Sequence, residues 1–260
     1  MHKPRRQLNM KSRGTLTSAI PGMRRILTFA ALGTIALAAA SASAAPPFAA
    51  HSKSGKSLVI PKKQAELGTV YYSLTGKAAQ IHFTSDAPLE DIKGQSNKVI
   101  GYVVAGPADN PANLQAGEWH LPVKSLKTGI PLRDEHLAGS AWLDAEKNPN
   151  IVFQLKNVRD IKLLKQGNGF STYSVTLVGD MTVHGVTREM SIPKSTVSFL
   201  KANKATAKVA RGDLLAIRAD YQISLKDFKV SHMAVEKGKV ANTISISTSL
   251  YLATIPPEKQ

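Results

Sequence analysis

The alternating stretch from residue 173 to residue 183, which ends at a His-Gly pair, is the feature that most limits the fold of this chain. Its apolar members are Tyr173, Val175, Leu177, Met181 and Val183. A period of two over this length predicts a half-buried antiparallel strand with its apolar side on a core. His184-Gly185 predicts a tight turn, because glycine accepts a positive φ freely and histidine does so more readily than most residues. We therefore expect a hairpin whose return strand covers 186–192.

Similar strand signals recur along the rest of the chain. Short apolar or alternating runs separated by turn residues predict further strands at 70–74, 80–84, 99–105, 118–123, 151–155, 215–225 and 244–250. Residues 86–98 are polar and could hold a short helical turn, and residues 126–142 are expected to include a short helix. Eight to nine antiparallel strands with little helix predict an all-β domain, either a sandwich or a closed barrel. Eight strands leave an interior wide enough for side chains or one slender ligand.

The first 44 residues have the pattern of a secretory signal peptide. A basic segment at 23–25 precedes an apolar run at 26–40, and Ala42-Ser43-Ala44 is a small-x-small cleavage site. Translation of this signal starts at Met1 or at Met23. We expect Sec-type export to the periplasm and removal of residues 1–44. A flexible leader at 45–67 and a barrel domain at 68–255 would remain.

Composition excludes several classes of function. The chain has 34 basic and 18 acidic residues, and the first 44 residues hold seven of the basic ones and no acid, which leaves a net charge of +9 after cleavage. This charge favours transient contact with an anionic membrane surface. It is not a nucleic-acid signature, because the lysines lack interleaved aromatic residues. The absence of cysteine excludes disulfides, thiolate metal sites, cysteine catalysis and a lipoprotein anchor.

Two motifs identify a family. Arg133-Asp134-Glu135-His136-Leu137, followed by residues 142–149 and the strand 151–153, resembles the central segment of the YceI-like family. Residues 179–188 resemble that family's other signature, and the resemblance extends over about 67–253. It implies an all-β, antiparallel eight-stranded lipocalin-like barrel with a short helical segment, usually exported. Such a barrel holds a polyisoprenoid or similar long-chain amphiphile in its lumen, and no catalytic reaction is established for the family in general.

The resemblance gives the expected ligand and its site. We expect an isoprenoid lipid or a quinone as the bound ligand and no other cofactor. The expected ligand-binding residues are Trp142, Phe153, Leu155, Tyr173, Val175, Leu177, Met181, Val183, Arg188, Arg133 and His136. Without the family, the inward apolar side chains favour a packed core over a cavity, and the resemblance reverses that preference. Residues 92–98 stand where the family tends to have a basic and aromatic segment, so the mouth of the pocket is expected to differ there.

The register of the hairpin decides where Arg188 lies. A two-residue turn pairs Met181 with Arg188, and paired residues share one face of a sheet. Arg188 then lies at the barrel mouth as a cation for a polar or pyrophosphate head group. A four-residue loop would instead pair Met181 with Met190, and the sequence leaves both registers open.

The sequence contains no recognised catalytic motif, such as G-x-S-x-G, H-E-x-x-H or a phosphate loop. Arg133, Asp134 and His136 could form a catalytic cluster, or they act locally, with Asp134 capping a turn and Arg133 paired with an acid. The histidines lack metal-ligand spacing, so no metal site is expected. The leading hypothesis is an exported lipid-binding protein for transport, storage or shielding. The alternatives are an enzyme or enzyme accessory acting on such a lipid, and a structural envelope stress protein with a packed core.

Overall fold

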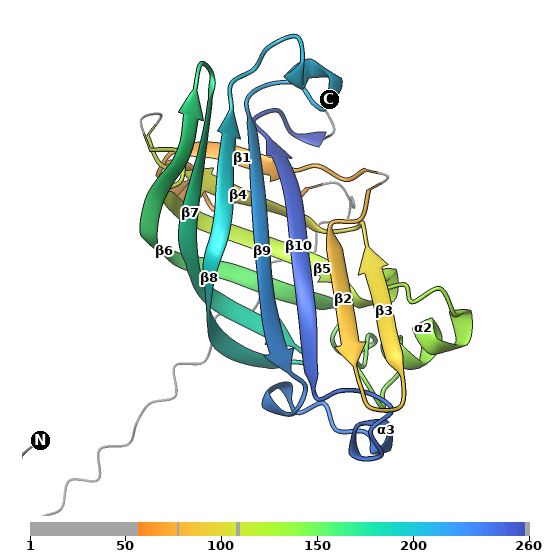
Figure 1. Ribbon diagram of the computed structural model, residues 1–260. Coiled ribbons are helices and arrows are strands. Elements are labelled where there is room, and N and C mark those ends of the chain that lie inside the picture. Colours follow the sequence, from red (N-terminus) through yellow and green to blue (C-terminus); the bar gives the residue numbers. More distant parts are fainter. Residues whose placement is uncertain (1–56, 77, 108–109, 258–260) are drawn as a thin grey trace, which may run out of the picture. The chain divides into compact units, whose positions relative to one another are not determined.

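The computed structural model describes residues 57–76, 78–107 and 110–257, and the expected signal peptide lies outside them (Figure 1). Within these residues ten strands form one antiparallel sheet. The strands are β1 (Thr69–Ser73), β2 (Ile81–Asp86), β3 (Asp91–Ser96), β4 (Ile100–Ala105), β5 (Leu114–Pro122), β6 (Asn150–Gly167), β7 (Phe170–Val183), β8 (Val186–Leu200), β9 (Leu214–Ser224) and β10 (Thr243–Ala253). The helices are α1 (Lys62–Ala65), α2 (Pro131–Ala138) and α3 (Met233–Glu236), with 3-10 turns η1 (Val123–Ser125), η2 (Thr206–Lys208) and η3 (Lys226–Phe228).

Strand β10 closes the sheet into a barrel. One of its edges pairs with β9 along the whole strand. On its other edge Leu252 and Ala253 pair with β1, whereas residues 244–248 pair with β2, which in turn pairs with β3. The strands β1 and β4 to β10 therefore form a closed ring of eight, and the β2–β3 hairpin extends the wall at one end. This arrangement confirms the expected eight-stranded antiparallel barrel, in which ring closure removes exposed sheet edges.

Two sets of hydrogen bonds connect the β2–β3 hairpin to the rest of the wall, one just before β2 and one at the outer edge of β3. The buried amide of Gln80 donates from Nε2 to the carbonyls of Leu74 (3.1 Å) and Val99 (3.2 Å) and accepts from the Val99 amide (2.8 Å). Gln80 is stable in the interior because these bonds replace those it would make with water. At the outer edge of β3, Gln95 and Lys127 exchange two backbone hydrogen bonds of 2.8 and 2.9 Å. They connect the β2–β3 hairpin to the segment before α2.

The hairpin in the 173–192 region has the two-residue turn. Val183 pairs with Val186 and Met181 with Arg188, so the alternative pairing of Met181 with Met190 is wrong. His184 and Gly185 have φ angles of 52° and 72°. Positive φ at both central positions is what a twisted two-residue hairpin turn requires.

Strand β3 was not expected from the sequence. Its burial alternates strictly, with Ile92, Gly94 and Ser96 turned inward. Of these, isoleucine alone has a strong preference for strands, so the polarity of residues 86–98 hid the period. The short helix expected within 126–142 is confirmed by α2, which begins at Pro131, a favoured first residue of a helix.

Residues 57–67, just before β1, lie on the outside of the barrel, and the rest of the expected leader lies outside the described residues. Leu58 and Ile60 pack against a small cluster that includes Tyr102 and Val104. The Tyr102 hydroxyl donates a 2.6 Å hydrogen bond to Oε1 of Gln64, close to the end of α1. Apolar contacts and one partly buried hydrogen bond thus hold this segment against the barrel. No helix in the described part of the chain combines the length and hydropathy that a membrane span needs.

Candidate functional site

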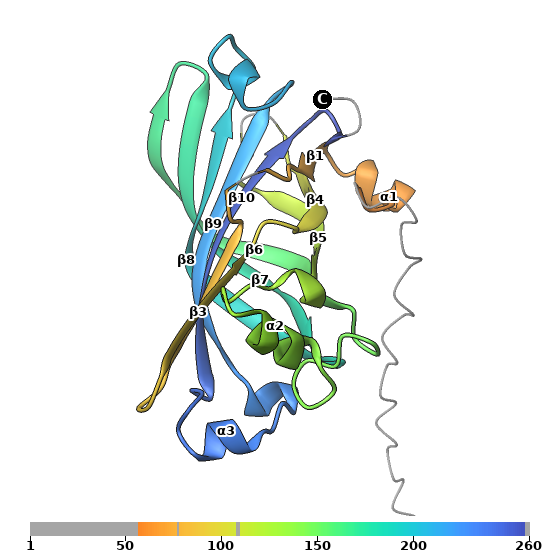
Figure 2. The ribbon, with the colours of Figure 1, turned by 90° about the vertical axis from the view of Figure 1, so that its right-hand side faces the viewer.

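An apolar cavity of about 320 Å³ lies inside the barrel at the end that carries α2, α3 and the β2–β3 hairpin (Figure 2). We call this cavity the outer chamber. Its walls include Phe83 and Ile92 from the hairpin, Val183 from β7 and Trp142 from the segment after α2. Its volume falls within the range of ligand pockets, roughly 300–1,000 Å³.

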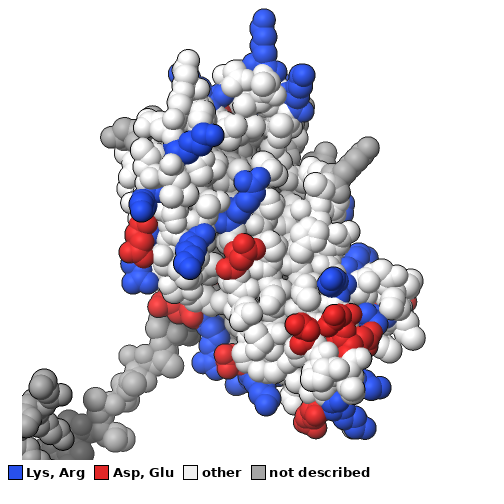
Figure 3. Space-filling view, viewed as in Figure 1, with Lys and Arg blue, Asp and Glu red and all other residues white. Residues whose placement is uncertain are grey.

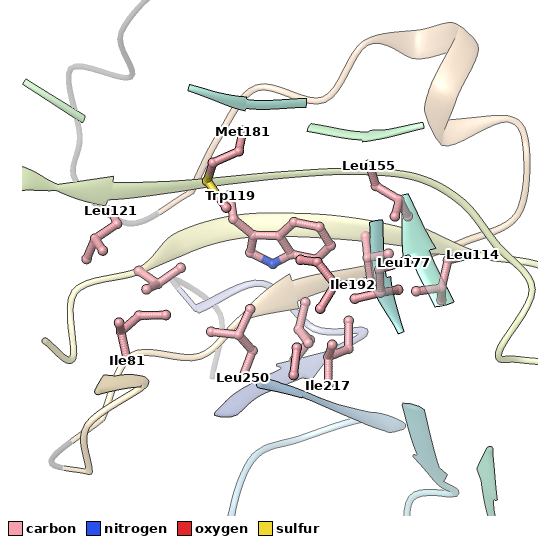
Figure 4. Close-up of a cluster of buried hydrophobic side chains, with 14 of the residues drawn as sticks. Ile81, Leu114, Trp119, Leu121, Leu155, Leu177, Met181, Ile192, Ile217 and Leu250 are labelled. Atoms are coloured by element: carbon pink, nitrogen blue, oxygen red, sulfur yellow. The ribbon is translucent and has the colours of Figure 1, made fainter. Parts of the chain in front are cut away.

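A second cavity of about 80 Å³ lies deeper in the barrel, and we call it the inner chamber. The two chambers adjoin, because they share the lining residues Ile81, Leu121, Ile151, Met181 and Tyr221. The inner chamber adds a set of apolar side chains from the surrounding strands: Trp119, Phe153, Leu177, Ile192, Ile217 and Leu250. All of these except Phe153 are labelled in Figure 4. The two chambers are thus neighbouring apolar spaces inside one barrel.

The expected apolar site residues are divided between these chambers and a packed core. Met181 and Val183 line the outer chamber, as does Trp142, while Phe153, Leu177 and Met181 line the inner one. Leu155, Tyr173 and Val175 are buried in the same core cluster but line neither chamber. A cavity and a packed core, which the sequence presented as alternatives, therefore occupy different lengths of one barrel.

Glycines make room for the aromatic rings of the inner wall. A Cβ atom at Gly101 would lie 2.5 Å from Cδ1 of Trp119, and one at Gly117 would lie 2.8 Å from Cη2 of the same ring. A Cβ at Gly179 would lie 2.7 Å from Cζ of Phe153. The two rings stack with centroids 6.1 Å apart. Because these glycines have no side chain, the rings lie against the wall and leave the lumen open.

Polar side chains surround the mouth of the outer chamber. Helix α2 places Arg133 and His136 three residues apart, hence on one helical face, and both border the chamber with Glu90 and Lys239. Arg133 Nη2 forms an ion pair with Glu90 Oε1, which joins α2 to the β2–β3 connection. The rim therefore offers cationic groups and imidazole nitrogens to a polar part of a ligand.

One histidine of the mouth stabilises α3 and packs on an aromatic ring. His232 stacks on Trp142 with ring centroids 4.4 Å apart and an angle of 25° between the planes. Its Nδ1 accepts a 3.0 Å hydrogen bond from the amide of Ala234, which caps the first turn of α3. Both rings border the outer chamber. His232 was not among the expected site residues.

Asp134 has a different role from its neighbours on α2. Its Oδ1 accepts hydrogen bonds from the amide and the hydroxyl of Thr128, both 2.7 Å long, and Lys127 Nζ lies 3.5 Å from Oδ2. Burial opposes ionisation of this carboxyl, but the Thr128 hydrogen bonds and the Lys127 charge outweigh it and lower its pKa. Asp134 anchors α2 and does not line the outer chamber, so Arg133, Asp134 and His136 do not converge into a catalytic cluster.

Arg188 lies at the rim but faces away from the cavity. Its Nε donates a 3.0 Å hydrogen bond to the carbonyl of Asp227 in η3, and it lines neither chamber. Of the two registers that the sequence left open, the structure has the one that pairs Met181 with Arg188, and the hydrogen bond to the 3-10 turn η3 holds the guanidinium outside the cavity. Within the residues that the structure describes, no cluster of three or more His, Asp or Glu side chains could hold a metal ion.

The residues that the sequence analysis missed lie on the strands opposite β7. Ile81 and Phe83 on β2, and Ile244 and Ile246 on β10, line the outer chamber. Their alternation is the same signal that was applied to 173–183 and could have found them. Ile92 gave no such signal, because the rest of its strand is polar.

Comparison with known proteins gives the family. The YceI-like domain model matches residues 72–252. Similar solved structures include BcnA of Burkholderia cenocepacia (17% identity, 66% of this chain and 95% of that chain, TM-score 0.47) and the YceI protein of Campylobacter jejuni (18%, 64% and 86%, 0.43). A polyisoprenoid binding domain from Saccharophagus degradans, implicated in plant cell wall breakdown, is also similar (10%, 70% and 97%, 0.49). No curated protein matches the chain. Because the family model covers most of its length, the chain belongs to the YceI-like domain family.

Proposed function

We propose that this protein binds a polyisoprenoid or a similar long-chain amphiphile inside its barrel and carries, stores or shields it. The observation that carries this proposal is the pair of adjoining apolar chambers, which open at a polar rim. Transfer of each methylene-sized group from water into such a cavity is worth about 0.8 kcal/mol. Several prenyl units therefore offset the entropy lost when the chain is ordered.

The proposed ligand is an isoprenoid lipid or a quinone, bound without any other cofactor. The apolar chambers suit the hydrocarbon part, and the rim of Arg133, His136, His232 and Lys239 suits polar parts that remain at the mouth. The engagement of Asp134 with Thr128 supports a binding role over a catalytic one, because it removes the carboxylate from the set that an enzyme would need.

In this proposal the protein is exported by its N-terminal segment, acts in the periplasm and touches an anionic membrane surface transiently. Acidic and basic side chains lie together at the end that carries the mouth (Figure 3). The segment 226–239 has four lysines against Asp227 and Glu236, and exposed Met233 lies within it. Co-sedimentation of the protein with phosphatidylglycerol vesicles tests this contact. A bound fraction that falls as the salt concentration rises supports it, and a bound fraction that is independent of salt contradicts it.

Native mass spectrometry of the protein purified without detergent, followed by organic extraction, tests the binding function. We expect a co-purifying long-chain lipid in the wild type. Val183→Phe should abolish it, because this buried side chain lines the outer chamber and a phenyl ring would fill the space. Val178→Phe is the matched control, since Val178 lies on the same strand and lines neither chamber. A wild type that neither carries lipid nor takes up added polyprenol would contradict the proposal.

A further inference from the structure

The inner chamber contains a buried hydrogen-bond donor with no acceptor. Trp119 is 7% exposed, and its ring lies among the apolar side chains of the cluster with the indole nitrogen directed toward them (Figure 4). Among the residues that the structure describes, no atom accepts a hydrogen bond from Nε1 of Trp119. Buried donors in native proteins are nearly always paired, so this N–H calls for an explanation.

A second polar group without a partner lines the same chamber. Oγ1 of Thr248 on β10 is buried and makes no hydrogen bond within the described structure. Tyr221 also borders the chamber, and burial raises the pKa of its hydroxyl. Trp119 on β5 and the polar side chains of Tyr221 and Thr248 on the paired strands β9 and β10 thus line one small apolar space.

We propose that Trp119 determines ligand specificity by donating a hydrogen bond from Nε1 to a neutral oxygen on the buried end of the ligand. A ketone, quinone or amide carbonyl has the required chemistry, because the indole N–H is a donor only. This inference rests on the proposed lipid-binding function. It narrows the ligand from any long apolar chain to one that carries a carbonyl oxygen at the end that reaches the inner chamber.

The lining of the inner chamber argues against the other kinds of buried end. A pure hydrocarbon would leave the indole N–H unpaired, which a site pays for in affinity. A phosphate or carboxylate would need a cation, and the described residues that line this chamber include no Lys, Arg or His. A neutral carbonyl satisfies the donor and brings no charge into the apolar space.

The test compares 2-tridecanone with tridecane, which match in length and differ by one carbonyl oxygen. The chain has two tryptophans, so a nitrogen-15 spectrum contains two indole N–H resonances, and Trp142→Phe identifies them. We expect the ketone to bind at least about tenfold more tightly than the alkane. We also expect the ketone alone to move the Trp119 indole proton downfield. In Trp119→Phe, which keeps a ring but removes the donor, the two probes should bind equally.

Three results would overturn the inference. They are equal affinities of the wild type for the two probes, an indole resonance that the ketone does not move, and a ketone preference that survives in Trp119→Phe. The spectrum of the wild type decides the question even where the variant fails to fold. The co-purified lipid measured by mass spectrometry remains a separate test of the proposed function. If the protein binds lipid but shows no preference for the ketone, the inference about Trp119 is wrong and the proposed lipid-binding function stands.

Discussion

The two chambers have the same apolar character but are built in different ways. The outer chamber is walled in part by the β2–β3 hairpin, α2 and α3. The hairpin and α2 are held by the Gln95–Lys127 pair and by side-chain contacts of Arg133 and Asp134. The inner chamber is lined by side chains of the strands and by Val99, the residue immediately before β4. Irregular elements with few backbone bonds open more easily than strands paired on both sides. Access should therefore be controlled at the outer chamber and selectivity at the inner one.

The same device, a glycine beneath an aromatic ring, occurs in both chambers and shows the difference directly. A Cβ atom at Gly94 in the outer wall would meet ring atoms of Phe83 as its three nearest neighbours. A Cβ at Gly179 in the inner wall would meet the backbone carbonyl of Gln154 as well as the ring of Phe153. A side chain can rotate away, whereas a carbonyl in a paired strand cannot move without disturbing the sheet.

The largest expected effect is therefore that of Gly179→Ala on stability. We expect the free energy of unfolding to fall by about 3 kcal/mol, because the new methyl group forces backbone displacement in β6 and β7. Gly94→Ala is the matched change in the outer wall, and we expect it to cost about 1 kcal/mol, since Phe83 turns into the outer chamber instead. Urea denaturation of both variants measures the difference. Equal losses would mean that the two walls are equally rigid.

Lipid binding should change in the opposite order to stability: Gly94→Ala should weaken it more than Gly179→Ala. Gly94→Ala should weaken lipid binding although it folds well, because the displaced ring occupies the outer chamber. A Gly94→Ala protein that retains its full complement of co-purified lipid would show that Phe83 finds space elsewhere.

An intermediate effect is expected at Asp134, which anchors α2. Asp134→Ala removes the acceptor of both Thr128 hydrogen bonds and should weaken the docking of α2 by about 1–2 kcal/mol. Hydrogen exchange of the peptide over 126–142 measures this local opening. Asp134→Asn is the matched control, because its amide oxygen can still accept from Thr128. Unchanged exchange in Asp134→Ala would contradict the anchoring role.

The same carboxylate gives the outer chamber a dependence on pH. The pKa of Asp134 is lowered in the folded protein, so its contribution to stability is complete above the ordinary aspartate pKa, about 3.9, and is lost as pH falls through the folded value. Exchange in 126–142 should accelerate below about pH 4 in the wild type. In Asp134→Asn that acceleration should be absent. The strands around the inner chamber should not follow the same titration.

Alternation in the sequence predicted which side chains point inward, but it could not predict which of them line a cavity. Val175 and Val183 have the same period, strand and burial, yet Val183 alone borders a chamber. The difference depends on what faces each residue across the barrel, and that is fixed by the register of several strands. Gly101 illustrates the limit further, because its importance arises from the ring of Trp119 on the next strand.

The mouth was predicted in part, for a related reason. The Arg133 to Leu137 motif correctly located the helix beside the pocket, and Trp142 lies on its wall. The contacts of Arg133 with Glu90 and of Trp142 with His232 join segments far apart in the chain, and no local sequence pattern encodes them. Polar strands such as β3 are hidden for the same reason, since their burial is set by neighbours and not by their own residues.

The smallest expected effect on stability is that of Arg133→Ala. This variant should change the rate at which lipid leaves the barrel while it changes the free energy of unfolding very little. The Arg133–Glu90 ion pair is partly exposed, so its loss should change the free energy of unfolding by less than about 1 kcal/mol. It nevertheless joins α2 to the β2–β3 connection at the mouth, so lipid should dissociate several-fold faster. Lys156→Ala is the matched control, because Lys156 pairs with Asp180 and Glu189 on the outside of the barrel. If both variants release a fluorescent polyprenyl probe at the wild-type rate, opening at α2 does not limit access, and the distinction between a mobile mouth and a fixed interior fails.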